Sequence, residues 1–144
     1  MSIFHLTNLA TSSIHAITHV GNLFSGVRNF QLKLADNFDV KTPGFYFIVV
    51  GGVVKHVSHA GIQKRQIGFR EVLNRLNCPR TLQNRDFSRQ LTKDMSTSVV
   101  KVYHMSYAAI RATLQIDEYS AQNNGLHMLT LLREKYTIVG RNQS

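Results

Sequence analysis

Residues 44–58 read GFYFIVVGGVVKHVS and constrain the fold more than any other stretch of the chain. Two runs rich in Val, Ile, Phe and Tyr flank the pair Gly51 and Gly52. Such side chains favour strands, and paired glycines supply the positive φ angles that a tight two-residue turn needs. The stretch therefore predicts a β-hairpin. The expected cross-strand pairs are Val50 with Val53, Val49 with Val54, Ile48 with Lys55, Phe47 with His56 and Tyr46 with Val57.

Length and charge limit what a protein built around this hairpin can be. The chain has 144 residues, 43% of them hydrophobic, which is enough for one ordinary core. Its 17 Lys and Arg against 8 Asp and Glu give a net charge of +9. Such an excess is typical of proteins that bind a polyanion, and nucleic acid is the leading class of partner. Structural proteins of ribosomes and virions carry similar charge without any catalysis.

Cysteine usage and hydropathy suggest an unexported protein. Cys78 is the only cysteine, so one chain can form neither a disulfide nor a zinc site based on several thiolates. No apolar run approaches the roughly 20 residues of a membrane span, and the N-terminus lacks the basic region of a secretory signal. We expect an intracellular chain that is not secreted and contacts no membrane, with association to a virion as one alternative.

Residues 1–27 contain no Asp, Glu, Lys or Arg. Apolar residues recur there at helical spacing: Ile3, Leu6, Ala10, Ile14, Ile17, Val20, Phe24 and Val27. We predict an amphipathic helix, either continuous or broken at residues 11–13. It either packs on the domain or forms an arm that docks on another protein or a second copy.

The remaining elements give an α+β class with a small three-stranded antiparallel sheet and flanking helices. Asp, Asn and Pro in residues 36–43 mark a connection, which divides the chain into an N-terminal helical arm and linker (1–43) and a main domain (44–144). Further periodicities predict a helix over 62–76, a strand over 97–105 and helices over 107–121 and 126–136.

Basic residues are concentrated between residues 55 and 93. The candidates for nucleic-acid contact are Lys64, Arg70, Arg75, Arg80, Arg85, Arg89 and Lys93. They are either a phosphate-contacting surface or an ordinary solvated face.

Two side chains fall where a helix should face the sheet. Arg65 lies four residues before Phe69 on the apolar stripe, a position suited to a phosphate clamp or to a side chain that snorkels to water. Glu118 follows Ile110 and Leu114 at helical spacing. Its carboxylate is either a ligand for Mg²⁺ or Mn²⁺ or a partner for an arginine.

Histidine pairs occur at His15 with His19 and at His56 with His59. Two imidazoles are too few for a zinc site, so we expect none. His56 ends the second strand near Tyr46, where an imidazole or a phenol is placed to handle a proton.

The order of these residues resembles the GIY-YIG nuclease family over roughly residues 44–136. Gly44, Phe45 and Tyr46 stand for the first motif, and His56, Val57 and Ser58 for the second. Arg65 stands for the helix arginine of the family, and Glu118, in the run LQIDEYS, for its metal-binding acid. The second motif has His and Ser where the family prefers Tyr and Gly. With a two-residue turn Tyr46 and His56 fall on opposite faces of the hairpin, and a β-bulge is needed to bring them together.

The resemblance implies hydrolysis of a phosphodiester at one Mg²⁺ or Mn²⁺ ion held by Glu118. Arg65 would stabilise the phosphorane charge, and Tyr46 with His56 would assist the attacking water. Two hypotheses follow: a nucleic-acid-binding domain with metal-dependent cleavage, or a non-catalytic component of a nucleoprotein or virion assembly.

Overall fold

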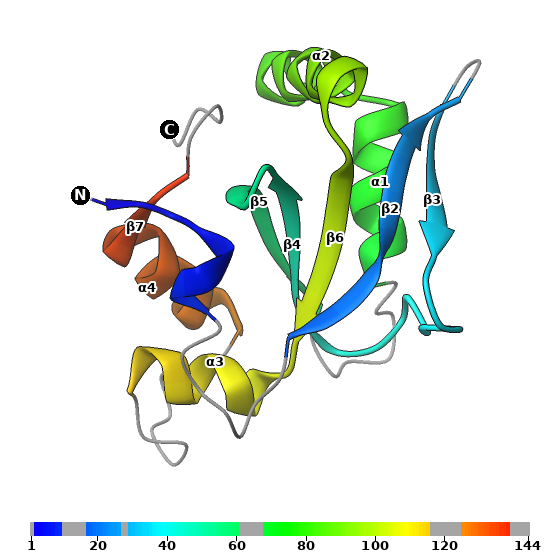
Figure 1. Cartoon of the computed structure of the whole chain (residues 1–144). Helices are drawn as coiled ribbons and strands as arrows, with labels where there is room; N and C mark the ends of the chain where they lie inside the picture. The colour runs from blue at the N-terminus through cyan, green and yellow to red at the C-terminus, as the bar shows by residue number, and fades with distance from the viewer. Residues whose placement is uncertain (1, 10–16, 27–28, 61–67, 116–124, 139–144) are drawn as a thin grey trace.

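The computed structural model describes residues 2–9, 17–26, 29–60, 68–115 and 125–138. The elements in chain order are β1 (Ser2–Ile3), the short 3-10 helix η1 (Leu6–Asn8), β2 (Thr18–Ser25), β3 (Phe30–Leu34), β4 (Gly44–Val50), β5 (Val53–Ala60), α1 (Phe69–Asn77), α2 (Leu82–Thr97), β6 (Val100–Met105), α3 (Tyr107–Leu114), α4 (Gly125–Lys135) and β7 (Tyr136–Thr137). The protein is therefore of the α+β class (Figure 1).

A five-stranded antiparallel sheet in the order β3-β2-β6-β4-β5 forms the centre of the molecule. The prediction of three strands is wrong, because β2 and β3 extend the sheet beyond β6. The three predicted strands are the adjacent set β6, β4 and β5. The predicted boundary between residues 43 and 44 lies in the connection from β3 to β4, and strands on both sides of it belong to this sheet.

The hairpin is confirmed, but its register differs from the prediction beyond the turn. Gly51 and Gly52 have φ angles of 56° and 79°, as the tight turn requires. Val50 pairs with Val53, whereas Ile48 pairs with His56 and not with Lys55. A β-bulge between Ile48 and Val49 gives β5 one extra residue, so every pair farther from the turn is shifted by one residue.

The predicted N-terminal helix is wrong, because Ser2–Ile3 form a strand and Leu6–Asn8 only a short 3-10 helix. Residues 18–25 form β2, although their apolar spacing predicted a helix. The cause is a second irregularity, between His19 and Gly21, in the pairing of β2 with β6. It leaves Val20 and Leu23, three residues apart, both buried in one cluster. A bulged strand therefore reproduces the three-residue spacing of a helix. Residues 10–16 lie outside the described part of the chain.

The remaining helices agree with the sequence in part. α3 and α4 are confirmed as helices, but α3 ends at Leu114, where Gln115 forms a left-handed C-cap inside the predicted range of 107–121, and Tyr136 belongs to β7. α1 begins only at Phe69, because Gly68, inside the predicted range of 62–76, is its N-cap with a φ of 56°.

α2 was not predicted, because Phe87 and Leu91 are its only buried residues and give a weak apolar stripe. Its first turn is capped by Thr81, whose side chain accepts a hydrogen bond from the Asn84 amide.

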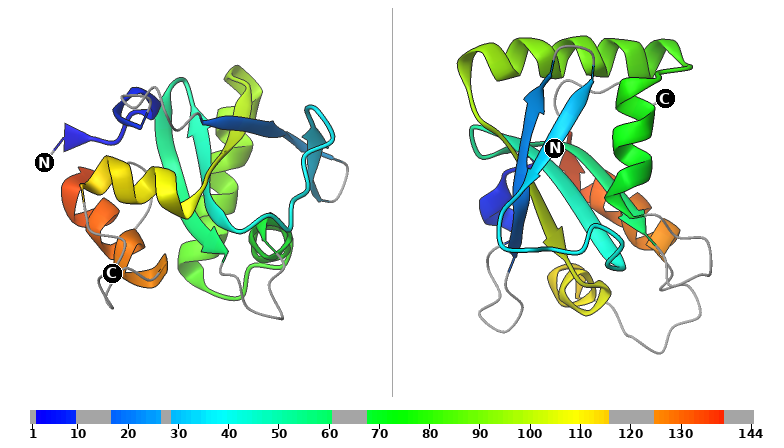
Figure 2. Two further views of the ribbon diagram at one scale, coloured as in Figure 1. Left: turned by 90° about the horizontal axis from the view of Figure 1, so that it is seen from below. Right: turned by 90° about the vertical axis from the view of Figure 1, so that its right-hand side faces the viewer.

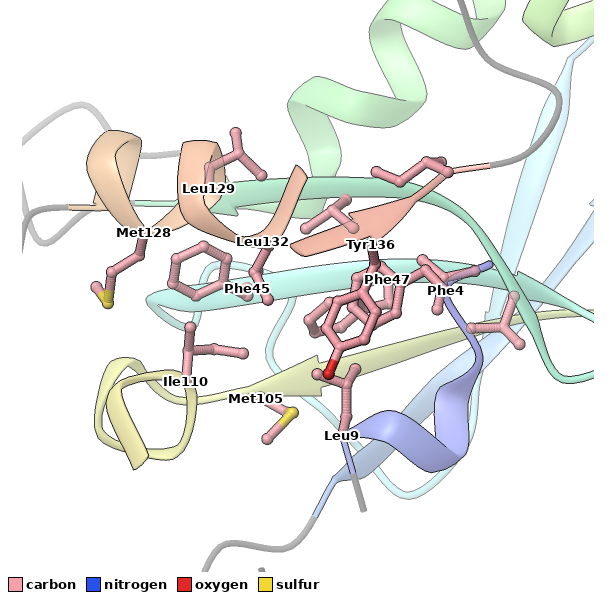
Figure 3. Close-up of a cluster of buried hydrophobic side chains, with 14 of the residues drawn as sticks. Phe4, Leu9, Phe45, Phe47, Met105, Ile110, Met128, Leu129, Leu132 and Tyr136 are labelled. Carbon is pink, nitrogen blue, oxygen red and sulfur yellow. The ribbon is translucent and has the colours of Figure 1, made fainter. Parts of the chain in front are cut away.

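Each face of the sheet has its own core. On one face, Phe45 and Phe47 of β4 pack with Met105, with residues of α3 and α4, and with the N-terminal segment (Figure 3). On the other face, Tyr46 and Ile48 pack with residues of α1 and α2. α1 runs along this second face and α2 lies across one end of the sheet (Figures 1 and 2). None of the helices in the described residues is long and apolar enough to cross a membrane.

Candidate functional site

The six described basic residues that were predicted to contact nucleic acid are all exposed. They are Arg70 and Arg75 on α1, Arg80 in the connection, and Arg85, Arg89 and Lys93 on α2. We call this set the basic face. The seventh, Lys64, lies outside the described residues.

On α2 the basic side chains form one row. Arg85, Arg89 and Lys93 are spaced four residues apart, a rise of about 6 Å per step along the helix axis. Phe87 and Leu91, which are buried, lie on the opposite side of the helix. Packing of the apolar side against the sheet therefore turns the cationic row toward solvent.

Few acidic groups neutralise this surface. Arg75 pairs with Glu71 at 2.5 Å, and Arg89 lies 3.6 Å from Asp86, with all four side chains well exposed. Exposed pairs of this kind contribute little and are screened by salt. Within the described part of the chain, Arg70, Arg80, Arg85 and Lys93 form no ion pair. The basic face is thus left with a local excess of positive charge.

Tyr46, the first residue assigned to catalysis, is buried below the connection into the hairpin. Its hydroxyl lies 2.6 Å from the Thr42 carbonyl, to which it donates, and 3.2 Å from the Val40 carbonyl. Burial, and secondarily the charge of Asp39, raise the pKa of the phenol. The phenol is therefore neutral and holds residues 40–42 against the sheet. Its role in proton transfer stays a prediction.

His104 shares this anchoring role and was not among the predicted site residues. Its Nε2 lies 2.8 Å from the Pro43 carbonyl, and because a carbonyl only accepts, Nε2 carries the proton. The rings of Tyr46 and His104 are 5.1 Å apart. Burial lowers the pKa of His104, and the hydrogen bond to Pro43 partly opposes that effect. The alternation of Val100, Val102 and His104 was the available signal that this imidazole faces inward.

His56 and Tyr46 lie on the same face of the hairpin. The bulge pairs Tyr46 with Ser58 and Ile48 with His56, so the expectation of opposite faces is wrong. The two side chains are diagonal neighbours, for which about 7–8 Å is typical. His56 is 8% exposed and its ring lies 5.3 Å from the ring of Phe87 on α2.

Arg65 and Glu118 lie outside the described residues. Their convergence with Tyr46 and His56, and the role of Glu118 as a metal ligand, therefore stay predictions. In the described residues no three His, Cys, Asp or Glu side chains are grouped as a metal site.

His59 lies on the opposite face of the sheet from His56, so the two rings do not converge. It packs beside Phe45, with ring centroids 6.0 Å apart. Burial, and secondarily the charge of Arg133, lower the pKa of His59. Its Nδ1 is buried and has no hydrogen-bond partner in the described part of the structure. The sequence singled out His59 only as a candidate metal partner of His56.

Taken together, the fold and the charges define a basic α+β domain, in which two helices packed on a five-stranded sheet carry exposed basic side chains. The chain belongs to the T4-like phage nuclear disruption protein (Ndd) family, whose sequence profile matches residues 6–141. No curated protein sequence matches the chain. A solved structure described as "Restriction endonuclease HPY188I in complex with product DNA" is remotely similar, with a TM-score of 0.43 and 13% identity over 74% of this chain and 68% of that one.

Proposed function

We propose that this protein binds DNA through the basic face. The observation that carries the proposal is the row Arg85, Arg89 and Lys93 on the side of α2 that faces away from the sheet. Cations along a rigid helix neutralise successive phosphates without reading the bases, so binding would not depend on sequence. The family's name, T4-like phage nuclear disruption protein, is compatible with a target that contains nucleic acid.

Salt dependence tests this proposal. Each phosphate contact contributes about −0.9 to the slope of log Kobs against log salt concentration on duplex DNA. The double variant R85Q/R89Q should give a slope shallower by roughly 2, whereas K41Q/K135Q removes the same charge elsewhere and should leave it close to that of the parent. Fluorescence anisotropy with a labelled duplex between about 50 and 200 mM salt measures both. Equal slopes for parent and R85Q/R89Q would refute the assignment.

The second candidate function is metal-dependent phosphodiester cleavage of the GIY-YIG type. The observation that favours it is the bulge, which brings Tyr46 and His56, both buried, to the same face of a hairpin paired with β6. Glu118 would hold Mg²⁺ or Mn²⁺, since such ions prefer carboxylate oxygens, and Arg65 would stabilise charge on the phosphate. The metal would polarise the phosphate and lower the pKa of a bound water.

Nicking of supercoiled plasmid separates cleavage from binding. With Mg²⁺ or Mn²⁺ present the parent should nick, and Glu118→Gln should abolish nicking while duplex affinity changes little. A parent that binds DNA but does not nick it would refute cleavage. The DNA-binding proposal would then stand without catalysis.

A further inference from the structure

The face of β2 and β3 that is turned away from α1 is not covered by any helix in the described residues (Figure 1). Cross-strand pairing identifies the side chains on it, because directly paired residues share a face. Asn22 of β2 pairs with Lys33 of β3 on one side and with Lys101 of β6 on the other. Both lysines are exposed. We call this surface the open sheet face.

Aromatic rings flank the row of lysines on the open sheet face. Phe24, next on this face of β2, is 46% exposed. At the other end, His19 and Tyr103 are cross-strand partners whose ring centroids lie 5.2 Å apart. Phe24 pairs with Gln31 of β3, so aromatic rings lie on both sides of the lysine-bearing part of this face.

A groove continues the open sheet face toward the β4–β5 turn. It has a volume of about 420 Å³, within the range of small-ligand sites. Val49, Lys101 and Tyr103 belong to its lining, together with Leu6, Gly51, Gly52, Ser98 and Val99. Gly51 and Gly52 contribute no side chain to the groove, and Val99 is 55% exposed.

The charge of this surface identifies the kind of partner it fits. None of the strands in the described residues contains Asp or Glu, so the two lysines face no carboxylate from the sheet itself. A partner that suits the surface carries repeated negative charge together with flat apolar groups. Unpaired nucleotides have both, since their phosphates attract lysine and every base has a π-face that stacks on an aromatic ring.

We propose that the open sheet face binds single-stranded nucleic acid. Phe24 and the Tyr103–His19 pair stack on bases, Lys33 and Lys101 contact the phosphates between them, and the groove receives a base beyond Tyr103. The side-chain amide of Gln31 lies on the same face as a hydrogen-bonding group for base edges. The Oδ1 of Asn22 lies 2.9 Å from His19 Nε2, which leaves its NH₂ group as a donor. This surface is separate from the basic face, so the two can fail independently.

The test compares labelled oligothymidylate, oligouridylate and duplex DNA by fluorescence anisotropy. Phe24→Ala should weaken binding of the better single-stranded ligand roughly tenfold, and Phe24→Tyr, which keeps a stacking ring, should restore it. The double variant K33Q/K101Q should weaken that ligand as well. None of these changes should alter duplex affinity, and R85Q/R89Q is the matched control that does. Thermal melting checks that each variant is folded.

Three results would overturn the inference. The first is a parent that binds duplex DNA but neither oligonucleotide, which leaves the proposed function intact. The second is folded Phe24→Ala and K33Q/K101Q proteins that bind the oligonucleotides as the parent does. The third is a parent dimer by light scattering that Phe24→Ala dissociates without changing oligonucleotide affinity, because the face would then be covered by a second copy.

Discussion

At the scale of single residues, two side-chain hydrogen bonds and one tightly packed glycine fix the segment that leads into the hairpin. Tyr46 and His104 fix the carbonyls of Thr42 and Pro43, and Gly44 starts β4 directly below them. Gly44 has a φ of +138°, a conformation that L side chains rarely adopt. A Cβ there would lie 2.5 Å from both His104 Nε2 and the Met105 carbonyl oxygen. Steric constraints therefore require glycine at position 44, the first residue of the Gly44–Phe45–Tyr46 motif.

Gly44→Ala should destabilise the protein by about 3 kcal/mol or more, since strained backbone and a clash in a packed region add. The matched control is Gly51→Ala, at a φ of +56° with no atom within 4 Å of the added Cβ. It should cost only about 1–2 kcal/mol. Urea unfolding of both variants measures the difference, and equal losses would contradict the steric explanation.

Tyr46→Phe removes the hydroxyl that donates to the loop carbonyl. The partly buried Thr42 carbonyl is left without its donor, so the free energy of unfolding should fall by about 1–3 kcal/mol. Chemical denaturation measures this loss. The same variant also tests the role of Tyr46 in catalysis. Full nicking activity in a folded Tyr46→Phe protein would exclude this phenol from the cleavage step. Loss of nicking at unchanged stability would refute its anchoring role.

His104 should make stability depend on pH. Its pKa is lowered in the folded state from the ordinary 6.5, so the unfolded chain takes up the proton first as pH falls. The free energy of unfolding should hold above about pH 6.5 and decrease below it, by at most about 1.4 kcal/mol per pH unit for one histidine. His59, whose pKa is also lowered, adds to the decrease.

His104→Gln keeps an N–H donor for Pro43 and removes the titrating ring. Unfolding curves from pH 7 to pH 5 should be flatter for this variant than for the parent, with part of the slope left by His59. The same slope in both proteins would show that His104 does not cause the effect.

At the scale of elements, the two sides of α2 have different roles. Phe87 and Leu91 attach it across the end of the sheet, while the other side carries the cationic row. Its position depends on few apolar contacts, so their loss should release the whole helix. The two bulges act at the same scale, because each turns one set of side chains to a new face of its strand.

Leu91→Ala should cost about 2–5 kcal/mol, because Leu91 is only 1% exposed within this attachment. Leu82→Ala on the same helix is the control, since Leu82 is 68% exposed and its truncation should change stability by less than about 0.5 kcal/mol. Thermal or urea unfolding measures both. Similar costs at the two positions would mean that α2 is not attached as described.

At the scale of the whole molecule, the N-terminal segment closes one core. Phe4 is fully buried and its ring stacks on Tyr136 at 4.5 Å (Figure 3). The Phe4 carbonyl accepts a hydrogen bond from the Val54 amide, and β1 pairs with β7 near the other end of the chain. Residues 2–9 are therefore an integral part of the domain.

Phe4→Ala should lower the free energy of unfolding by about 3–5 kcal/mol. Ile3→Ala, at a side chain that is 45% exposed, is the neighbouring control and should have a much smaller effect. Denaturant unfolding distinguishes a segment that belongs to the core from an arm that docks on another protein or a second copy. For such an arm, both variants would be as stable as the parent, and only assembly, measured by light scattering, would change.

The sequence by itself determined the local features of this protein: the glycine turn, the strand character of β4, β5 and β6, the helices α1, α3 and α4, and the exposed arginines. Each depends on neighbours in the chain, through turn conformation, side-chain periodicity or charge. Only the tertiary structure decided the width of the sheet, the strand character of residues 18–25 and the packing of α2. These depend on bulges and on contacts between distant segments, and a bulge changes which face a side chain occupies without changing the residues that the sequence displays.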